Sequence, residues 1–335
     1  MKFAVAGAGA IGAYLGAKMA RAGYDVTLFA RGAHCRAMQE QGVRVLSPEG
    51  DFDAHPSVVD SLAAAGRVDV VFLAVKAHSL PALAPQLPLL FGEETAVVSM
   101  QNGIPWWYFT GAERLEKIDP AGVISTAIEA RRVIGSIVYL STEIAEPGVI
   151  RHNESTRITL GEPDGARSDR CRAISEALAR SGLRAPITTH IRQEIWVKLM
   201  GNIAFNPISA LTGATLATIA RDPDASHLVR AIMAETEALA SKLGIEMPIT
   251  IDQRIAGAEK VGEHKTSMLQ DLEADRPLEL DAIAGAALEL GERLGVPMPH
   301  TRAVYACTKL RVLSATLPNR KTKGKGGDRS GILTV

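Results

Sequence analysis

Residues 1–31, MKFAVAGAGAIGAYLGAKMARAGYDVTLFAR, decide the fold. The apolar run FAVAGA at 3–8 is typical of a buried parallel strand, and a helical pattern follows it and ends at Gly23. DVTLFA at 25–30 reads as the next strand. Strand, helix and strand in this order predict a βαβ unit, in which a glycine-rich turn joins the first strand to the helix.

That turn is GAGAIG, a G-x-G-x-x-G motif formed by Gly7, Ala8, Gly9, Ala10, Ile11 and Gly12. Its first glycine permits a tight turn, the second leaves room for a pyrophosphate, and the third lets the helix pack closely on the strand. The N-terminus of the helix offers free N–H groups and the positive end of the helix dipole to a phosphate. The motif therefore predicts a dinucleotide site, against the alternative of a glycine-rich turn without a ligand.

The end of the second strand indicates which dinucleotide binds. An acidic residue there would accept a hydrogen bond from the ribose 2′-hydroxyl of NAD, but Arg31 stands nineteen positions after Gly12. A guanidinium suits a 2′-phosphate, so Arg31 predicts NADP(H) as the cofactor; a solvated surface arginine is the alternative. Lys76 and Asn102 end two further predicted strands, at 69–76 and 95–102, and are candidate ligand contacts at the same edge of the sheet.

The remaining patterns divide the chain into two regions. VRVL at 43–46 reads as a strand. Residues 123–133, 136–153 and 157–163 look like successive strands with short turns, such as Glu146-Pro147-Gly148, which extend the sheet in mixed or antiparallel fashion. Residues 168–182 read as a helix with Ser168 as its N-cap. Beyond about residue 190 the sequence reads only as helices, at 190–213, 226–244, 264–275 and 279–295. We therefore expect an α/β fold: a Rossmann-type doubly wound sheet over 1–189, an all-helical domain over 190–316, and a basic, disordered tail over 317–335.

Composition narrows the classes of partner. The 335 residues include 37 Lys and Arg and 37 Asp and Glu, so the chain has no basic bias toward nucleic acid or an anionic membrane. No apolar run is long enough to span a bilayer, the N-terminus does not read as a signal peptide, and the three cysteines lack metal-ligand spacing. We expect a cytoplasmic protein without a bound metal, and the apolar faces of its helical domain are compatible with a homodimer.

A polar stripe marks the stretch EIWVKLMGNIAFNPISAL at 194–211. Lys198, Asn202 and Asn206 recur every four residues, so they share one face of a helix. Pro207 predicts a kink or an end of that helix just past Asn206. Amides beside an apolar stripe need hydrogen-bond partners, which spacing alone allows to be either a ligand or the protein itself.

The pattern W-x-K-x-x-x-N-x-x-x-N-P at 196–207 resembles the 2-dehydropantoate 2-reductase (ketopantoate reductase) family. So do HKTSMLQDLEADRPLELDAI at 264–283, QNGIPWWYF at 101–109 and RVIGSIVY at 132–139, and the resemblance extends to about residue 312. It implies a 6-phosphogluconate-dehydrogenase-like fold with an active site in the cleft between a Rossmann domain and a helical domain. The activity it implies is NADPH-dependent reduction of 2-dehydropantoate to pantoate, in pantothenate and coenzyme A biosynthesis.

The resemblance also implies roles for individual residues. The catalytic lysine is Lys198 and the active-site glutamate is Glu279, which either accepts a hydrogen bond from a substrate hydroxyl or orients Lys198. The substrate contacts fall on Asn202, Asn206 and Ser267, and the NADP(H) contacts on Gly7, Ala8, Gly9, Ala10, Ile11, Gly12, Arg31, Lys76, Asn102 and Glu279.

One departure from the family pattern leaves the substrate less defined than the family. A further asparagine found in some family members has no equivalent here, since the matching position is the apolar Leu216. A reductase of another 2-keto or 3-keto acid therefore stays open. A non-catalytic NADP(H)-binding sensor is the second alternative, and the retained Lys198, Asn202, Ser267 and Glu279 argue against it.

An aromatic cluster follows Asn102 and consists of Trp106, Trp107 and Tyr108. We expect it to pack in the core or an interface, or else to form a wall of the substrate cleft.

Overall fold

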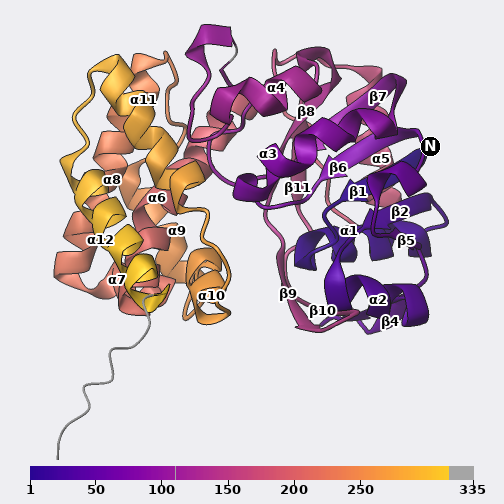
Figure 1. Ribbon diagram of the computed structural model, residues 1–335. Helices are drawn as coiled ribbons and strands as arrows, with labels where there is room; N and C mark the ends of the chain where they lie inside the picture. The colour runs from indigo at the N-terminus through magenta and orange to yellow at the C-terminus, as the bar shows by residue number, and fades with distance from the viewer. Residues whose placement is uncertain (110, 317–335) are drawn as a thin grey trace, which may run out of the picture.

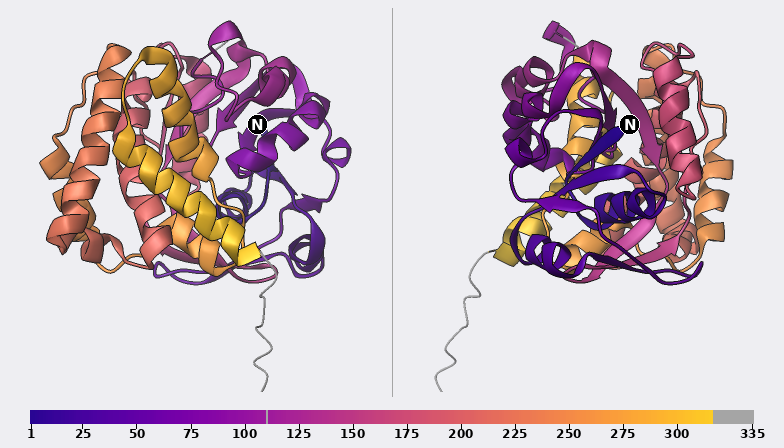
Figure 2. Two further views of the ribbon diagram at one scale, coloured as in Figure 1. Left: turned by 60° about the vertical axis from the view of Figure 1, so that its left-hand side comes forward. Right: turned by 90° about the vertical axis from the view of Figure 1, so that its right-hand side faces the viewer.

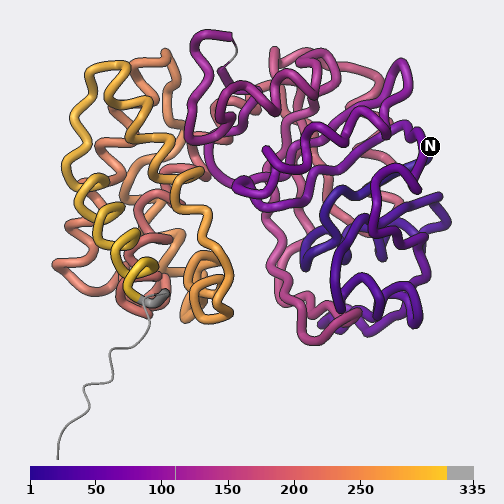
Figure 3. Tube along the Cα trace, in the orientation of Figure 1, coloured from indigo at the N-terminus to yellow at the C-terminus, as the bar shows by residue number. Residues whose placement is uncertain are grey.

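The computed structural model describes residues 1–109 and 111–316, which form two halves lying side by side (Figures 1 and 3). The first half, coloured indigo to magenta, contains all the strands among these residues, and the second half, orange to yellow, is helical. The predicted fold class, a doubly wound sheet followed by a helical region, is therefore confirmed. The tail expected to be disordered, 317–335, lies outside the described residues.

The main sheet has seven strands in the order β11-β8-β7-β6-β1-β2-β5. The strands from β5 to β8 pair in parallel, and β11 pairs with β8 in the antiparallel sense. In this doubly wound sheet the strand order reverses beside β1. Ligands bind to such sheets at the carboxyl ends of the strands next to this point. The strands are β1 (Lys2–Ala6), β2 (Asp25–Phe29), β5 (Ser57–Val59), β6 (Val68–Leu73), β7 (Phe91–Ser99), β8 (Val133–Val138) and β11 (Ile158–Gly161).

Both faces of the main sheet are buried, because successive strand residues point to opposite sides. Phe3 and Val5 belong to a core shared with helices α1 (Ala10–Arg21) and α5 (Asp169–Arg180). Ala4 and Ala6 face the other core, which continues without a break into the helical half. This shared core holds the two halves against each other.

A second sheet of four strands, in the order β4-β3-β10-β9, lies on the far side of α1. The predicted strand at 43–46 is correct, but it belongs to this sheet and not to the main one. The turn predicted at Glu146-Pro147-Gly148 is present, but the stretch 136–153 is divided between the two sheets. Its first residues belong to β8 and the rest form a hairpin of the second sheet, whose strands are β3 (Val43–Leu46), β4 (Phe52–Ala54), β9 (Ser141–Glu146) and β10 (Val149–Glu154).

The prediction of a strand at 123–133 is wrong. The chain forms the short helix α4 (Val123–Ala127) and a 3-10 turn at Ala130–Arg132, and β8 begins only at Val133. The Asp119 carboxylate explains the difference, because it accepts hydrogen bonds from the first backbone N–H groups of α4, at Ile124 and Ser125. This cap outweighs the strand preference of the β-branched residues that follow.

The helical half is arranged around α6, which contacts helices α7, α8, α10 and α12 and also strand β8. The four helices predicted beyond residue 190 are present, and the sequence did not reveal three more, α7, α9 and α12. The left-hand view of Figure 2 shows yellow α12 crossing the outside of this half. The helices are α6 (Ile191–Thr212), α7 (Leu216–Arg221), α8 (Pro223–Lys242), α9 (Ile251–Val261), α10 (Ser267–Glu273), α11 (Ala286–Leu294) and α12 (Pro299–Thr316).

The sequence predicted either a kink or an end of the helix at Pro207, and the second of these is wrong because α6 continues past it. The helix continues to Thr212, and Pro207, Ile208 and Ala210 are all buried. Packing on both sides of α6 therefore outweighs the hydrogen bond that the proline removes. Among the described residues, no helix has both the length and the apolar character that crossing a membrane requires.

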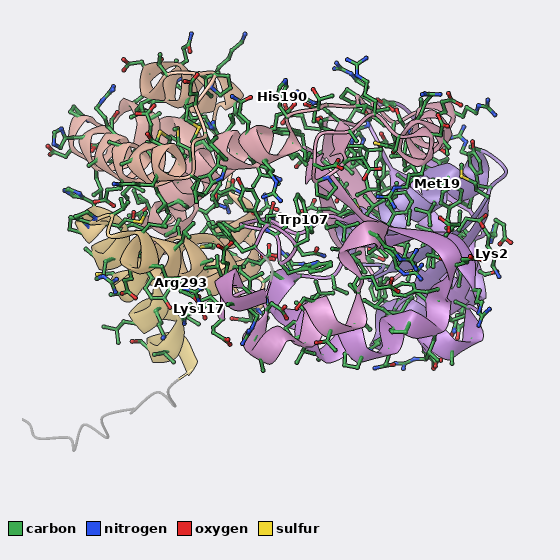
Figure 4. The ribbon with its side chains drawn as sticks, turned by 90° about the horizontal axis from the view of Figure 1, so that it is seen from above. Lys2, Met19, Trp107, Lys117, His190 and Arg293 are labelled. Carbon is green, nitrogen blue, oxygen red and sulfur yellow. The ribbon has the colours of Figure 1, made fainter. Side chains whose placement is uncertain are left out.

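A segment of the first half also reaches across to α11. The Glu289 carboxylate accepts hydrogen bonds from the backbone N–H groups of Glu116 and Lys117, at 2.9 and 3.0 Å. Arg293 donates to the carbonyl of Arg114 at 2.7 Å, and Figure 4 shows Arg293 beside Lys117. These bonds add a polar connection to the shared apolar core.

Candidate active site

Three loops with predicted ligand contacts meet at the carboxyl edge of the main sheet. The glycine turn follows β1, Lys76 follows β6, and Asn102 follows β7. Because β1, β6 and β7 are adjacent and parallel, these three loops lie next to one another. The strand order reverses beside β1, so this is also the place where a doubly wound sheet binds its ligand.

The glycine turn has the geometry that a pyrophosphate needs. Gly7 has a φ of +108°, and a Cβ there would lie 2.5 Å from Val75 Cγ1 and 2.7 Å from the Val75 nitrogen. At Gly9, by contrast, a Cβ would meet no atom within 4 Å, so the absent side chain leaves open space. Gly9 is also the N-cap of α1, and among the described residues no side chain caps the first N–H groups of this helix. The turn therefore fits a phosphate group.

Arg31 lies at the end of β2 as the N-cap residue of α2 (Gly32–Gln41). Its guanidinium carbon lies 5.2 Å from the centre of the Phe29 ring, and the side chain is exposed. Within the described part of the chain, the guanidinium has no hydrogen bond or ion pair. It is therefore available to an anion beside the glycine turn.

Helix α6 places Lys198 where the two halves meet. Its ammonium donates hydrogen bonds to Asn102 Oδ1 at 2.9 Å and to the carbonyl of Val138 at 2.6 Å. The ammonium also lies 5.6 Å from the centre of the Tyr139 ring. Asn102 follows β7, and Val138 ends β8, so one lysine from the helical half is held by two strand ends of the first half.

The environment of Lys198 favours loss of its proton. Burial lowers the pKa of Lys198 from 10.5 to about 8, and Glu279 opposes this while the positive charges of Arg254 and Lys76 add to it. A lysine with a pKa near the working pH exchanges its proton readily and suits general acid catalysis. The position thus supplies both a fixed ammonium and a transferable proton.

Glu279 accepts hydrogen bonds from three donors of the first half. Its buried carboxylate accepts hydrogen bonds from Asn102 Nδ2 at 3.1 Å, the backbone N–H of Ala77 at 3.0 Å, and Lys76 Nζ at 3.3 Å. Lys76 forms a second ion pair of 2.7 Å with buried Asp271. Burial by itself lowers the pKa of Lys76, but the carboxylates of Glu279 and Asp271 outweigh burial and raise it above its usual value. Lys76 therefore stays protonated, and its two ion pairs connect the first half to the helical half.

Asn102 connects this ion-pair cluster to Lys198. Its amide nitrogen donates to Glu279 while its amide oxygen accepts from Lys198, so the carboxylate acts on the ammonium through one side chain. Sequence reasoning proposed Asn102 as an NADP(H) contact and did not reveal this link. It also missed Asp271 and the Val138 carbonyl, because neither has a signal in the local pattern.

Three candidate substrate residues are left without protein partners. Asn206 is buried, Asn202 is partly buried, and Ser267 is exposed as the first residue of α10. In residues 1–109 and 111–316, none of these three side chains takes part in a hydrogen bond. The amide atoms of Asn206 are not among the fully buried polar atoms that lack a partner, so the polar stripe of α6 offers unused hydrogen-bonding groups that a ligand can reach.

The aromatic cluster proves to be packing. Trp106, Trp107 and Tyr108 are at most 6% exposed, and Figure 4 shows Trp107 where the two halves meet. Trp107 donates to Ser99 Oγ at 2.7 Å, and Trp196 of α6 donates to the Tyr108 hydroxyl at 2.9 Å. The cluster therefore holds α6 against the sheet.

Gly103, next to Asn102, brings the two halves into backbone contact. Its φ is +89°, and a Cβ there would lie 2.8 Å from the carbonyl carbon of Ala282 and even closer to the oxygen. We expect Gly103→Ala to lower the free energy of unfolding by about 3 kcal/mol, since backbone strain and this collision add. Gly23→Ala is the matched control, because Gly23 has a φ of +87° with nothing within 4 Å, and it should cost only about 1 kcal/mol. Equal losses in urea titrations of the two variants would exclude the collision as a cause.

Comparison with known proteins decides the family. A model described as ketopantoate reductase PanE/ApbA matches residues 3–165, and one for the C-terminal part of the same family matches residues 190–312. The chain belongs to the ketopantoate reductase family. The family resemblance inferred from the motifs is confirmed, and the two models divide the chain near the start of α6.

Individual members of the ketopantoate reductase family cover nearly the whole chain. A 2-dehydropantoate 2-reductase of Mesorhizobium japonicum is 49% identical over 316 residues, which is 92% of this chain and 97% of that protein. The structure of 2-dehydropantoate 2-reductase from Methylococcus capsulatus has a TM-score of 0.82 at 30% identity and covers 95% of this chain and 99% of its own. D-Mandelate dehydrogenase, in a structure with NADH and anilino(oxo)acetate, shares the fold with a TM-score of 0.83 at 23% identity, over 94% of this chain and 99% of its own.

Proposed function

We propose that this member of the ketopantoate reductase family reduces 2-dehydropantoate, a 2-keto acid, to pantoate with NADPH. The observation that carries the proposal is Lys198, a lysine of lowered pKa whose ammonium is held by Asn102 and Val138 where the halves meet. The 49% identity to a 2-dehydropantoate 2-reductase over most of the chain supports this substrate. We further propose that residues 1–189 bind the cofactor and residues 190–316 supply the catalytic lysine.

The residues of the first half suit NADPH. The glycine turn would hold the pyrophosphate, Arg31 the 2′-phosphate, and Lys76 and Asn102 lie at the next two strand ends. When bound, NADPH supplies a hydride for the carbonyl carbon of the substrate. The protein must then stabilise the negative charge that develops on the carbonyl oxygen.

Lys198 is the group that meets this charge. Its ammonium donates a hydrogen bond to the carbonyl oxygen and transfers one proton as the oxygen becomes a hydroxyl. The neutral amine then regains a proton from solvent, which a pKa of about 8 permits. Asn102 and the Val138 carbonyl keep the nitrogen in place during transfer. Asn202, Asn206 and Ser267 supply the free polar groups that fix the substrate.

The pH dependence should report the protonation of Lys198. We expect kcat/KM for the keto acid, at saturating NADPH, to stay level below about pH 7 and to fall about tenfold per pH unit above about pH 8. The sign follows because the acid form is the protonated one, and burial brings its pKa down to this range. A profile that stays level up to about pH 10 would remove Lys198 from the proton transfer.

Arg31 should set the preference for the phosphorylated cofactor. We expect Arg31→Ala to lower kcat/KM for NADPH by about 10- to 100-fold and to leave NADH nearly unchanged, because only NADPH carries the 2′-phosphate. Arg180→Ala, which removes an exposed arginine at the end of α5, is the control and should alter neither cofactor. An unchanged preference in Arg31→Ala would mean that another residue reads the 2′-phosphate.

The direct test of the function is a substrate screen. The purified protein is assayed by the loss of NADPH or NADH absorbance with 2-dehydropantoate and with a panel of other 2-keto and 3-keto acids. We expect the highest kcat/KM of the panel with NADPH as the cofactor and 2-dehydropantoate as the substrate. A tenfold preference for another acid would change the substrate and keep the mechanism. NADPH binding without turnover of any acid would favour a sensor.

A further inference from the structure

Arg254, on α9, lies against the same part of α6 that carries Lys198. A Cβ built on Gly201 would fall on the Arg254 guanidinium, 2.6 Å from Nε and closer still to Cζ and Nη2. Gly201 is three residues after Lys198, so the guanidinium occupies the space that a side chain would fill next to Lys198 on this side of α6. The glycine is therefore what admits the arginine to the site.

The Arg254 guanidinium has no counter-charge. It is partly buried, and across residues 1–109 and 111–316 it has no hydrogen bond and no ion pair. Burial lowers the pKa of Arg254, although Tyr139 opposes this shift. A partly desolvated guanidinium without an anion is less favourable than a paired one, and its nitrogens are not among the fully buried atoms, so a ligand can reach them.

The neighbouring cations all have partners in the protein, and Lys198 is hydrogen-bonded to Asn102 and the Val138 carbonyl. Lys76 has ion pairs with Asp271 and Glu279, and Arg157 lies 3.6 Å from the Glu194 carboxylate. Arg254 thus offers an unpaired positive charge next to the polar stripe of α6. Its five N–H donors form a planar fork that matches the two oxygens of a carboxylate.

We infer that Arg254 binds the carboxylate of the 2-keto acid and selects acids over uncharged carbonyl compounds. The inference rests on the proposed function and extends it by naming the group that recognises the charge of the substrate. The carboxylate lies one bond from the keto carbon, so a guanidinium near Lys198 would hold the carboxylate while the ammonium meets the carbonyl oxygen. Asn202 shares the face of α6 with Lys198 and has no hydrogen-bond partner among the described residues, so it can donate to the same ligand.

Binding of a carboxylate at Arg254 would also act on Lys198. The charge of Arg254 lowers the pKa of Lys198, together with that of Lys76, while Glu279 raises it. A bound carboxylate would neutralise the Arg254 contribution and so keep Lys198 protonated when substrate is present. The acid would thus promote its own reduction, and an uncharged analogue would not.

The test compares 2-dehydropantoate with its methyl ester, which keeps the ketone and lacks the charge. In the wild type we expect kcat/KM for the acid to exceed that for the ester by at least about tenfold. In Arg254→Gln the acid should lose this advantage through a higher KM, so that the two substrates differ by less than about threefold, with the Kd for NADPH unchanged. Arg221→Gln is the control, since Arg221 pairs with Glu259 on the outer surface of α9, and it should keep the preference.

Two further variants separate recognition from structure. Gly201→Ala keeps Arg254 but displaces its guanidinium, so it should lose the preference for the acid as well. Arg254→Lys keeps a charge and should restore part of the preference. If Arg254→Gln lowers both substrates equally, or retains the wild-type ratio, the inference is wrong. If the wild type reduces neither acid nor ester, the proposed function itself fails, which is a different outcome.

Discussion

Replacement of Lys198 by alanine is expected to lower kcat by about 10²- to 10⁴-fold and to leave the Kd for NADPH within about twofold of the wild type. The loss follows because the ammonium is the group placed to protonate the carbonyl oxygen, and it is held by Asn102 and the Val138 carbonyl and not by the glycine turn. In energy terms, the expected loss is about 3–5 kcal/mol of transition-state stabilisation. Single-turnover rates and NADPH fluorescence titrations measure the two quantities separately.

A control variant and a pH profile test whether the loss is due to proton transfer by Lys198. Lys260→Ala, which removes an exposed lysine of α9, should leave both kcat and NADPH binding unchanged. The residual rate of Lys198→Ala should no longer fall above about pH 8, since the group that titrates there is gone. Near-normal turnover in Lys198→Ala would assign the proton transfer to another residue.

Replacement of Glu279 by alanine is expected to damage stability and catalysis together. The buried carboxylate accepts from Lys76, Asn102 and the Ala77 N–H, so its loss removes one of the two ion pairs of Lys76 and leaves the other two donors without this acceptor. We expect the free energy of unfolding to fall by about 3 kcal/mol, a value reduced from that of a fully buried pair because Lys76 is 40% exposed and keeps Asp271. We expect kcat to fall as well, because Asn102 loses the bond that fixes it against Lys198.

The milder change Glu279→Gln separates charge from shape. The amide retains one acceptor oxygen, but it no longer raises the pKa of Lys198, so the alkaline fall in kcat/KM should begin at a lower pH. Glu273→Ala is the control on α10, where an exposed ion pair with Lys265 is lost and the cost should be about 1 kcal/mol or less. A pH profile of Glu279→Gln identical to that of the wild type would show that Glu279 does not act on Lys198.

The parts of the fold and site that the sequence reveals are those governed by neighbouring residues. The glycine turn, Arg31 at the end of β2, and the stripe of Lys198, Asn202 and Asn206 all follow from regular spacings within one element. The Ser168 cap of α5 is of the same kind, and the structure confirms its hydrogen bond from the Cys171 N–H. The family motifs then extended these local patterns to an activity.

The errors arose where a contact outside the repeating pattern of a segment outweighed that pattern. Residues 123–127 look like a strand, but the Asp119 carboxylate caps them as a helix. Residues 43–46 are a strand, but pairing with β10, far along the chain, assigns them to the second sheet. Pro207 lies inside a helix because its buried surroundings outweigh the missing hydrogen bond.

The sequence by itself determined a dinucleotide fold, the arginine suited to NADP(H), and the face of α6 that carries the lysine. Only the tertiary structure decided that Lys198 meets Asn102, that Asn102 meets Glu279, and that Arg254 lies on Gly201. The physical reason is range. Backbone geometry repeats every two or 3.6 residues and is therefore legible locally, whereas the burial and charge pairing that tune Lys198 depend on residues brought together by folding.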